Sequence, residues 1–196
     1  MSLLIVATWP LVRRRDIERP STSTQPPGVA HHEAGHAVAA WYFGYPIDFV
    51  TIDPAEDFAC RCIASPVLKK DGASETDVKP DDYVKVLKAI DVCLAGREAD
   101  AVCTGRRHWS GSRRDRHLAV ALAASLCRDS AEIAALLAWR RIGTHALVVK
   151  YTEEIDAVTR ALLEHRRLTG NEIRVAINSA LARRPTPLNV EGNESL

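Results

Sequence analysis

The residues best suited to chemistry are two histidines and a glutamate in the string HHEAGH at residues 31–36. His32, Glu33 and His36 form the pattern H-E-x-x-H. On a helix, residues four positions apart lie on the same face, about 6 Å from each other, so both imidazoles can bind one metal ion. Glu33 then lies beside the ion, where its carboxylate can take a proton from a zinc-bound water. The spacing therefore predicts a zinc-dependent peptidase with Glu33 as its catalytic base.

A catalytic zinc site needs a third protein ligand from elsewhere in the chain. One helix face supplies only two ligands, and the fourth position of the ion must stay open for the reaction. Asp115 is one candidate, since the arginines around it favour the ionised form that binds a metal. The alternative is that Asp115 only caps the helix that follows it. The residue types alone leave further candidates open: Glu98, Asp100, His108 and His117.

The composition is that of an ordinary globular protein. The 196 residues include 26 Lys and Arg against 25 Asp and Glu, and 46% are hydrophobic. A net charge of +1 excludes a chain-wide polyelectrolyte and argues mildly against a nucleic-acid-binding protein. Only 6% of the residues are aromatic, which favours helices packed by small side chains. Five cysteines without a secretory signal predict reduced thiols and a cytoplasmic location.

Hydrophobic periodicity predicts a mainly α fold (α+β) with a small antiparallel β-hairpin. The motif lies in an expected helix over residues 29–43, and residues 48–53 and 58–63 read as the two strands. A last helix begins at Thr169, where Thr169 and Glu172 form a capping-box pattern. The other expected helices cover residues 80–105, 117–127, 131–142 and 152–167.

The chain is expected to form one compact domain with a segment at each end. Residues 1–28 read as an N-terminal segment with a Pro-, Ser- and Thr-rich linker, 29–184 as a zinc metallopeptidase-like domain and 185–196 as a disordered tail. The apolar run at residues 2–12 is about half the ~20 residues that a spanning helix needs, so no transmembrane segment is expected. A phosphate-binding G-x-x-x-x-G-K loop is also not found in the sequence.

Four strings occur along the chain in an order typical of one family. They are HEAGHAVAAW at residues 32–41, FVTIDP at 49–54, LAGREAD at 94–100 and GSRRDRHLA at 111–119. Together they resemble the protease domain of the FtsH-type, membrane-anchored ATP-dependent zinc metalloproteases, whose active-site helix carries HEAGHA. The third string is similar to that family's L-G-G-R-A-A-E segment. The fourth is similar to its G-A-S-N-D-L segment, whose aspartate is the third zinc ligand. The resemblance extends over roughly residues 28–183.

This resemblance implies a role for each matching position. It implies that His32, His36 and Asp115 bind one Zn²⁺ per chain and that Glu33 is the general base. Asp100, where the family usually has Glu, is expected to orient a ligand histidine from behind. The implied substrates are peptides or unfolded proteins. With no ATPase module in this sequence, unfolding would need a separate ATPase partner, and the family's hexamers imply a homo-oligomer.

Two other functions remain open from the sequence. The zinc site could belong to a non-catalytic interaction module derived from a protease, which would hold metal without hydrolysis that depends on Glu33. The arginine-rich loop at residues 106–117, with His108 and Trp109, could instead make the chain a nucleic-acid-binding adaptor. That function predicts binding that weakens steeply with salt.

Overall fold

A computed structural model describes residues 27–53, 60–62, 80–105 and 112–184. The expected N-terminal segment and linker up to residue 26 and the expected tail at 185–196 lie outside these residues. The elements are α1 (Pro27–Tyr42), β1 (Ile47–Thr51), β2 (Cys60–Cys62), α2 (Pro80–Thr104), α3 (Ser112–Ala124), α4 (Ser130–Lys150), α5 (Thr152–His165), β3 (Arg167–Thr169) and α6 (Gly170–Leu181). The predicted mainly α fold with a small antiparallel hairpin is confirmed. Within the described residues, no helix is long and apolar enough to cross a membrane.

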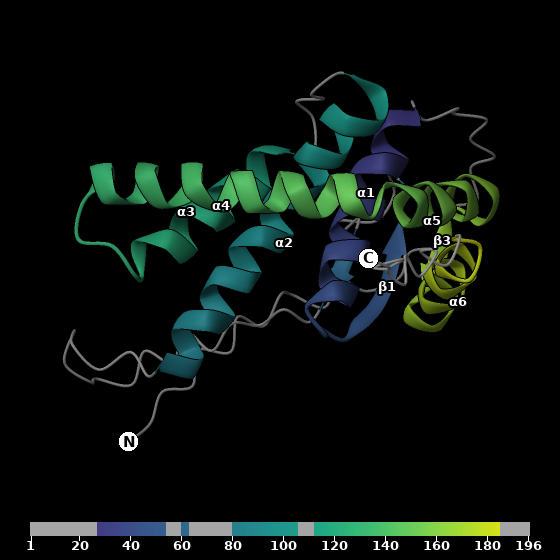
Figure 1. The fold of residues 1–196 in the computed structure, drawn as a ribbon, viewed down its shortest axis with the longest axis horizontal. Coiled ribbons are helices and arrows are strands. Elements are labelled where there is room, and N and C mark those ends of the chain that lie inside the picture. The colour runs from purple at the N-terminus through teal and green to yellow at the C-terminus, as the bar shows by residue number, and fades with distance from the viewer. Residues whose placement is uncertain (1–26, 54–59, 63–79, 106–111, 185–196) are drawn as a thin grey trace, which may run out of the picture.

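Helix α1 lies at the centre of the larger hydrophobic core and packs against α2 and α5 (Figure 1). It was expected over residues 29–43 and begins two residues earlier. Its core side chains are almost all small and fully buried: Ala30, Ala34, Ala37, Val38, Ala39 and Ala40. Because small side chains let two helix backbones approach closely, this composition sets how near the neighbouring helices can come.

The closest approach of α1 to α2 is at Gly35. A Cβ atom at this position would lie 2.6 Å from the Cβ of Ala99 and 2.8 Å from the carbonyl oxygen of Ala95. Both distances are shorter than van der Waals contact, so only glycine fits here. This crossing brings the face of α1 that carries the H-E-x-x-H motif against α2.

The small sheet has three antiparallel strands in the order β2-β1-β3. The β1–β2 pair is the predicted hairpin, but β3 was not predicted, since residues 152–167 were expected to form one helix. In the structure α5 ends at His165, and Arg166 takes a left-handed conformation with φ 62° that turns the chain into β3. A strand of three residues is too short to show a two-residue alternation, so hydrophobic periodicity does not reveal it. The capping box of Thr169 and Glu172 at the start of α6 is confirmed.

Two other helix boundaries differ from the sequence prediction. Helix α3 begins at Ser112 and not at residue 117, so Asp115 lies in its first turn. The exposed arginines of this segment are good helix formers, and their charge does not prevent a helix. Helix α4 continues to Lys150 and does not end at residue 142. Gly143 lies at an exposed position with no neighbouring atom within 4 Å, and its weak helix propensity, about 1 kcal/mol below Ala, does not break the helix.

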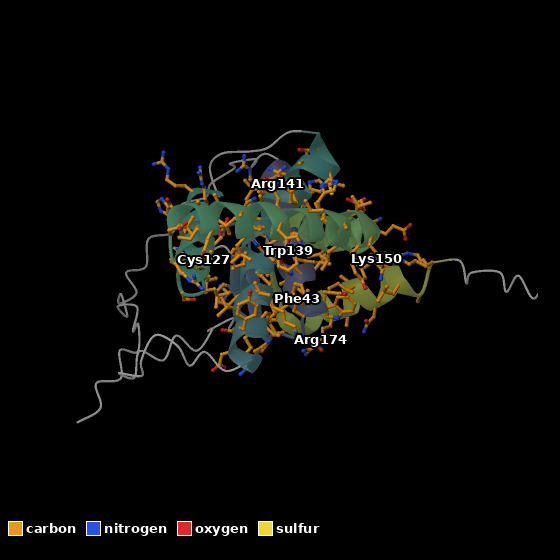
Figure 2. All side chains as sticks on the ribbon, turned by 60° about the vertical axis from the view of Figure 1, so that its left-hand side comes forward. Phe43, Cys127, Trp139, Arg141, Lys150 and Arg174 are labelled. Carbon is orange, nitrogen blue, oxygen red and sulfur yellow. The ribbon has the colours of Figure 1, made fainter. Side chains whose placement is uncertain are left out.

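Helix α4 is joined to α2 by a buried charged group. Asp91 on α2 is 3% exposed and accepts hydrogen bonds from two nitrogens of Arg140, with its Nε at 2.9 Å. Thr144 donates a third hydrogen bond to the same carboxylate. Trp139 and Arg141 of the same helix are exposed (Figure 2). The buried contacts hold α2 from the side opposite α1 and fix its position in the bundle.

The helix crossing can be tested with Gly35→Ala. The added methyl group meets backbone atoms of α2 that cannot turn away, so the substitution should lower the free energy of unfolding by about 1–3 kcal/mol. Urea denaturation monitored by circular dichroism measures this change. The matched control is Gly143→Ala, which adds a methyl group in open space and should raise the stability by up to about 1 kcal/mol. Equal stabilisation by both substitutions would contradict the crossing described here.

Candidate metal centre

The two motif histidines and Asp115 meet where α1, α2 and α3 come together. The Nε2 atoms of His32 and His36 lie 3.1 Å apart. The Oδ2 atom of Asp115, from α3, lies 3.0 Å from Nε2 of His32 and 3.3 Å from Nε2 of His36. These three residues come from two segments about 80 positions apart in the chain, and the fold places their donor atoms in a triangle.

The triangle has the dimensions that a zinc ion requires of its ligands. Nitrogen and oxygen ligands at about 2.0–2.1 Å from a tetrahedral ion are separated from each other by roughly 3.3 Å. The three observed separations, 3.0, 3.1 and 3.3 Å, are close to this value. The donor set of two imidazoles and one carboxylate is also a common one for catalytic zinc. His32, His36 and Asp115 would therefore fit a zinc ion with little movement.

The opposite side of each imidazole is held by a hydrogen-bond acceptor. Nδ1 of His32 lies 2.9 Å from Oδ2 of the fully buried Asp100. Nδ1 of His36 lies 2.7 Å from the carbonyl oxygen of Val92. When Nδ1 donates its proton to these acceptors, the lone pair of each ring is on Nε2 and faces the triangle. Asp100 and Val92 both belong to α2, so this helix orients the two rings carried by α1.

Gly96 of α2 lies directly against the two imidazoles. A Cβ atom built on Gly96 would lie 2.5 Å from Nε2 of His36 and 2.8 Å from Nε2 of His32. Any side chain at this position would occupy the space beside the donor atoms. The backbone of α2 thus forms one wall of the site, and glycine is required there for the same steric reason as Gly35 in the crossing.

The electrostatics of the cluster favour a positive charge at its centre. Burial alone would lower the pKa of His36, but the charge and hydrogen bond of Asp115, together with Glu33, outweigh it and raise that pKa to about 10. Burial likewise opposes a raised pKa at His32, yet the hydrogen bonds to Asp100 and Asp115 raise it. Burial would raise the pKa of Asp115, but the two histidines lower it. A bound cation would take the place of the protons that these groups attract.

Glu33 lies next to this cluster and is only 6% exposed. Burial raises the pKa of its carboxyl group, and the neighbouring His36 and His32 act in the opposite direction. A buried carboxylate with raised proton affinity is a stronger base than one in water. Glu33 is close enough to His36, His32 and Asp115 for their charges to act on its pKa.

Among the described residues, the other candidates for the third ligand do not contribute a donor atom to the triangle. Asp100 lies behind it, on Nδ1 of His32. Glu98 faces away from it, with Oε2 3.1 Å from Nδ1 of His145 and Oε1 3.7 Å from Nε of Arg141. His117 is exposed on α3, and no ligand cluster in the described part of the chain includes it. His108, like the rest of the loop at residues 106–111, lies outside the described residues.

Sequence reasoning missed two components of the site. The carbonyl of Val92 cannot be recognised from residue types, because every residue carries one. Gly96 lies within the string LAGREAD, and a glycine inside an otherwise helical pattern is a signal of close approach that could have been followed.

Comparison with known proteins finds a distant relative. No family model matches the chain. The chain is 27% identical, over 177 residues, to the ATP-dependent zinc metalloprotease FTSH 9, chloroplastic/mitochondrial, of Oryza sativa subsp. japonica. The match covers 76% of this chain and 22% of the rice protein, so the chain spans about a fifth of the length of that relative. This is a distant similarity to an FtsH-type zinc metalloprotease.

The wall formed by α2 predicts that Gly96→Ala abolishes metal binding. The new methyl group would lie within 3 Å of both Nε2 atoms, while the helix itself gains propensity. We expect zinc content, measured by elemental analysis after dialysis, to fall from about one ion to near zero at this site. Gly143→Ala serves again as the control and should retain the metal. A Gly96→Ala protein that is folded and still binds zinc as the parent does would refute this arrangement.

The hydrogen bond from His32 to Asp100 predicts weaker zinc binding by Asp100→Ala. Loss of an acceptor behind a ligand histidine typically weakens metal affinity 10–100-fold. Asp100→Asn keeps an acceptor oxygen without the charge and should give an intermediate loss. Titration against a chromophoric chelator measures these affinities, with Asp82→Ala on the same helix as the control. Unchanged affinity in Asp100→Ala would show that this contact does not support the site.

Proposed function

We propose that this chain is a zinc-dependent peptidase that uses His32, His36 and Asp115 as zinc ligands and Glu33 as general base. The observation that carries the proposal is the convergence of three donor atoms within 3.3 Å of one another. The buried Glu33 directly follows His32 in α1. The distant similarity to a zinc metalloprotease supports the same reaction class. The Asp115 side chain is 26% exposed, so the cluster is reached by solvent from the α3 side.

In the proposed hydrolysis, some residues of the chain bind the metal and Glu33 transfers the proton. Zinc, when bound, supplies a Lewis acid that polarises the peptide carbonyl and makes a nearby water more acidic. Glu33 accepts a proton from the water as the water oxygen bonds to the carbonyl carbon. Glu33 then delivers that proton to the amide nitrogen as the C–N bond breaks, which releases an amine and a carboxylic acid. Asp100 and the Val92 carbonyl keep the imidazoles oriented throughout the reaction.

We further propose that the substrates are peptides or segments of unfolded proteins. An extended chain is the form in which a peptide bond can reach a group of side chains that are mostly buried within a helical bundle. ATP dependence is part of the name of the rice protein, and a separate ATPase partner for this chain remains a proposal. An assay with an already unfolded substrate needs no such partner.

Glu33→Gln tests the proposed reaction. The amide keeps the shape of the carboxylate but cannot accept the proton, so cleavage of self-quenched fluorescent casein should fall about 10²- to 10⁴-fold. Zinc content should stay at the parent level. The control is Glu164→Gln on α5, whose side chain is 75% exposed and which should cleave as the parent does.

The metal content of the same proteins separates the outcomes. His36→Ala and Asp115→Ala should lose the zinc bound at this site together with the activity. Zinc that is bound through these residues without any hydrolysis in the parent would overturn the enzyme and leave a non-catalytic zinc module. Normal hydrolysis by Glu33→Gln would remove Glu33 from the mechanism.

A further inference from the structure

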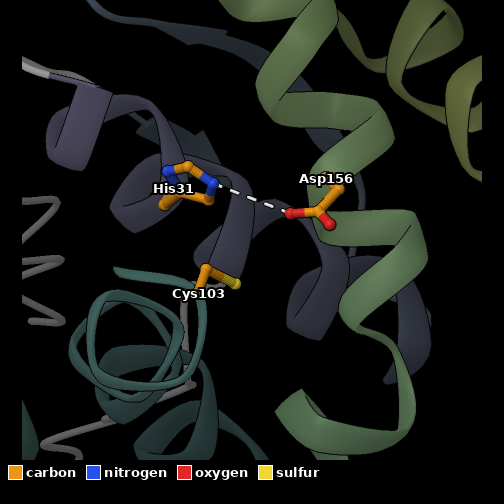
Figure 3. Close-up of side chains that lie close together, drawn as sticks. All are labelled: His31, Cys103 and Asp156. Atoms are coloured by element: carbon orange, nitrogen blue, oxygen red, sulfur yellow. Dashed lines mark ion pairs between the residues drawn. The ribbon is translucent and has the colours of Figure 1, made fainter. Parts of the chain in front are cut away.

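A second group of potential metal ligands lies on the other side of α1. His31 of α1, Cys103 of α2 and Asp156 of α5 point toward one another (Figure 3). Each offers one ligand atom, and these atoms all lie within 4.8 Å of one another. Nε2 of His31 is 3.6 Å from Oδ1 of Asp156. In the described part of the chain, this group and the triangle of His32, His36 and Asp115 are the two clusters with such geometry.

We propose that His31, Cys103 and Asp156 form a second metal site, for a thiophilic divalent ion such as Zn²⁺. Ligands of a tetrahedral zinc ion are separated by roughly 3.3 Å for a nitrogen–oxygen pair and about 3.6 Å where a sulfur is involved. The observed separation of His31 and Asp156 is within a few tenths of an ångström of the first value. No pair of ligand atoms is more than 4.8 Å apart. This is at most about 1.2 Å beyond the separation expected for a pair with sulfur, so small side-chain rotations would bring all three atoms to a common ion.

The donor set determines which ion would bind. One thiolate, one imidazole and one carboxylate give three ligands and leave a fourth position to solvent. Burial, and then the charges of Asp156 and Asp100, raise the pKa of the Cys103 thiol to about 11. Sulfur and imidazole are softer donors than carboxylate or water oxygens, so this donor set favours Zn²⁺ and Co²⁺ over Mg²⁺ and Ca²⁺.

An ion can reach the cluster from solvent. A pocket of about 520 Å³ is lined by His31 and Asp156, and the Asp156 side chain is 51% exposed. Glu153, Arg160 and Arg183 also line this pocket. Two acidic and two basic side chains leave it with little net charge, so selectivity depends on the donor atoms and not on a general attraction of cations.

Occupation of this site would join three helices at one point. The ion would connect α1 to both α2 and α5, the two helices that α1 contacts most extensively. His31 directly precedes His32 in α1, and successive helix residues point about 100° apart. The second ion would thus lie on a different side of α1 from the first and hold the start of the helix that carries the proposed catalytic residues.

Cobalt absorption can identify the second site without interference from the first. A cysteine ligand gives Co²⁺ an intense sulfur-to-metal charge-transfer band in the near ultraviolet, and the first site has no sulfur. The background protein carries Cys60→Ser and Cys62→Ser, which removes the two cysteines that are closest together in the sequence. Titration of this folded protein with Co²⁺ should give the band and about two bound ions per chain.

Variants of two of the ligands then show whether the band comes from this site. Cys103→Ser, nearly the same size as cysteine, should abolish the band and reduce the bound Co²⁺ from about two ions to one. Asp156→Asn, at a half-exposed position where folding is not at risk, should weaken binding at least 10-fold. Cys127→Ser, in the turn between α3 and α4, is the matched control and should leave the band unchanged (Figure 2).

The outcomes distinguish this proposal from the proposed function. Absence of the band, or a band that persists unchanged in Cys103→Ser, overturns the second site. A single bound ion that is lost in His36→Ala, without a sulfur band, overturns the second site and leaves the first intact. A sulfur band with a single ion that depends on Cys103 supports the second site, even if the first binds no metal.

Discussion

The close approach of α1 and α2 is the constraint on which the candidate metal centre depends. It requires glycine on both helices. Gly35 of α1 leaves room for Ala95 and Ala99 of α2, and Gly96 of α2 leaves room for the imidazoles of α1. Larger residues at either position would separate the helices, and the acceptors of α2 would no longer reach Nδ1 of the two histidines. The chemistry of the site thus depends on the steric fit between the two backbones, because the imidazoles can be oriented by α2 only when the helices are this close.

Burial of so many polar groups is costly unless each is compensated. His32, His36, Glu33 and Asp100 are each at most 6% exposed. Each imidazole makes two contacts that offset the cost of its burial. Its Nδ1 atom is hydrogen-bonded to an acceptor of α2, and its Nε2 atom lies near the Asp115 carboxylate. The raised pKa values of both histidines follow from this excess of negative charge. A site built in this way favours a positive charge at its centre.

The sequence predicted the features that depend on local patterns. Helix α1, the β1–β2 hairpin and the capping box at Thr169 follow from periodicity or from residues within one turn of each other. The short strand β3 has no periodicity to detect, and its existence depends on pairing with β1. The third candidate ligand lies about 80 positions from the histidines in the chain. Residue types alone do not decide which of several candidates it is. Asp115 was singled out only through the resemblance of its segment to a family motif, and the structure places it in the first turn of α3, beside the histidines.

The contributions of α2 to both candidate metal sites share one face of that helix. Val92, Gly96, Asp100 and Cys103 are spaced by four, four and three residues, which is the spacing of a single helical stripe. The first three contact the rings of His32 and His36, and the fourth lies beside His31 one turn further along. A rotation of α2 by one residue, about 100°, would remove all four from α1 at once. The buried link from Asp91 to Arg140 and Thr144 opposes such a rotation from the other side of the helix. The polar contact with α4, which includes none of the proposed ligands, is therefore part of what sets the geometry of both sites.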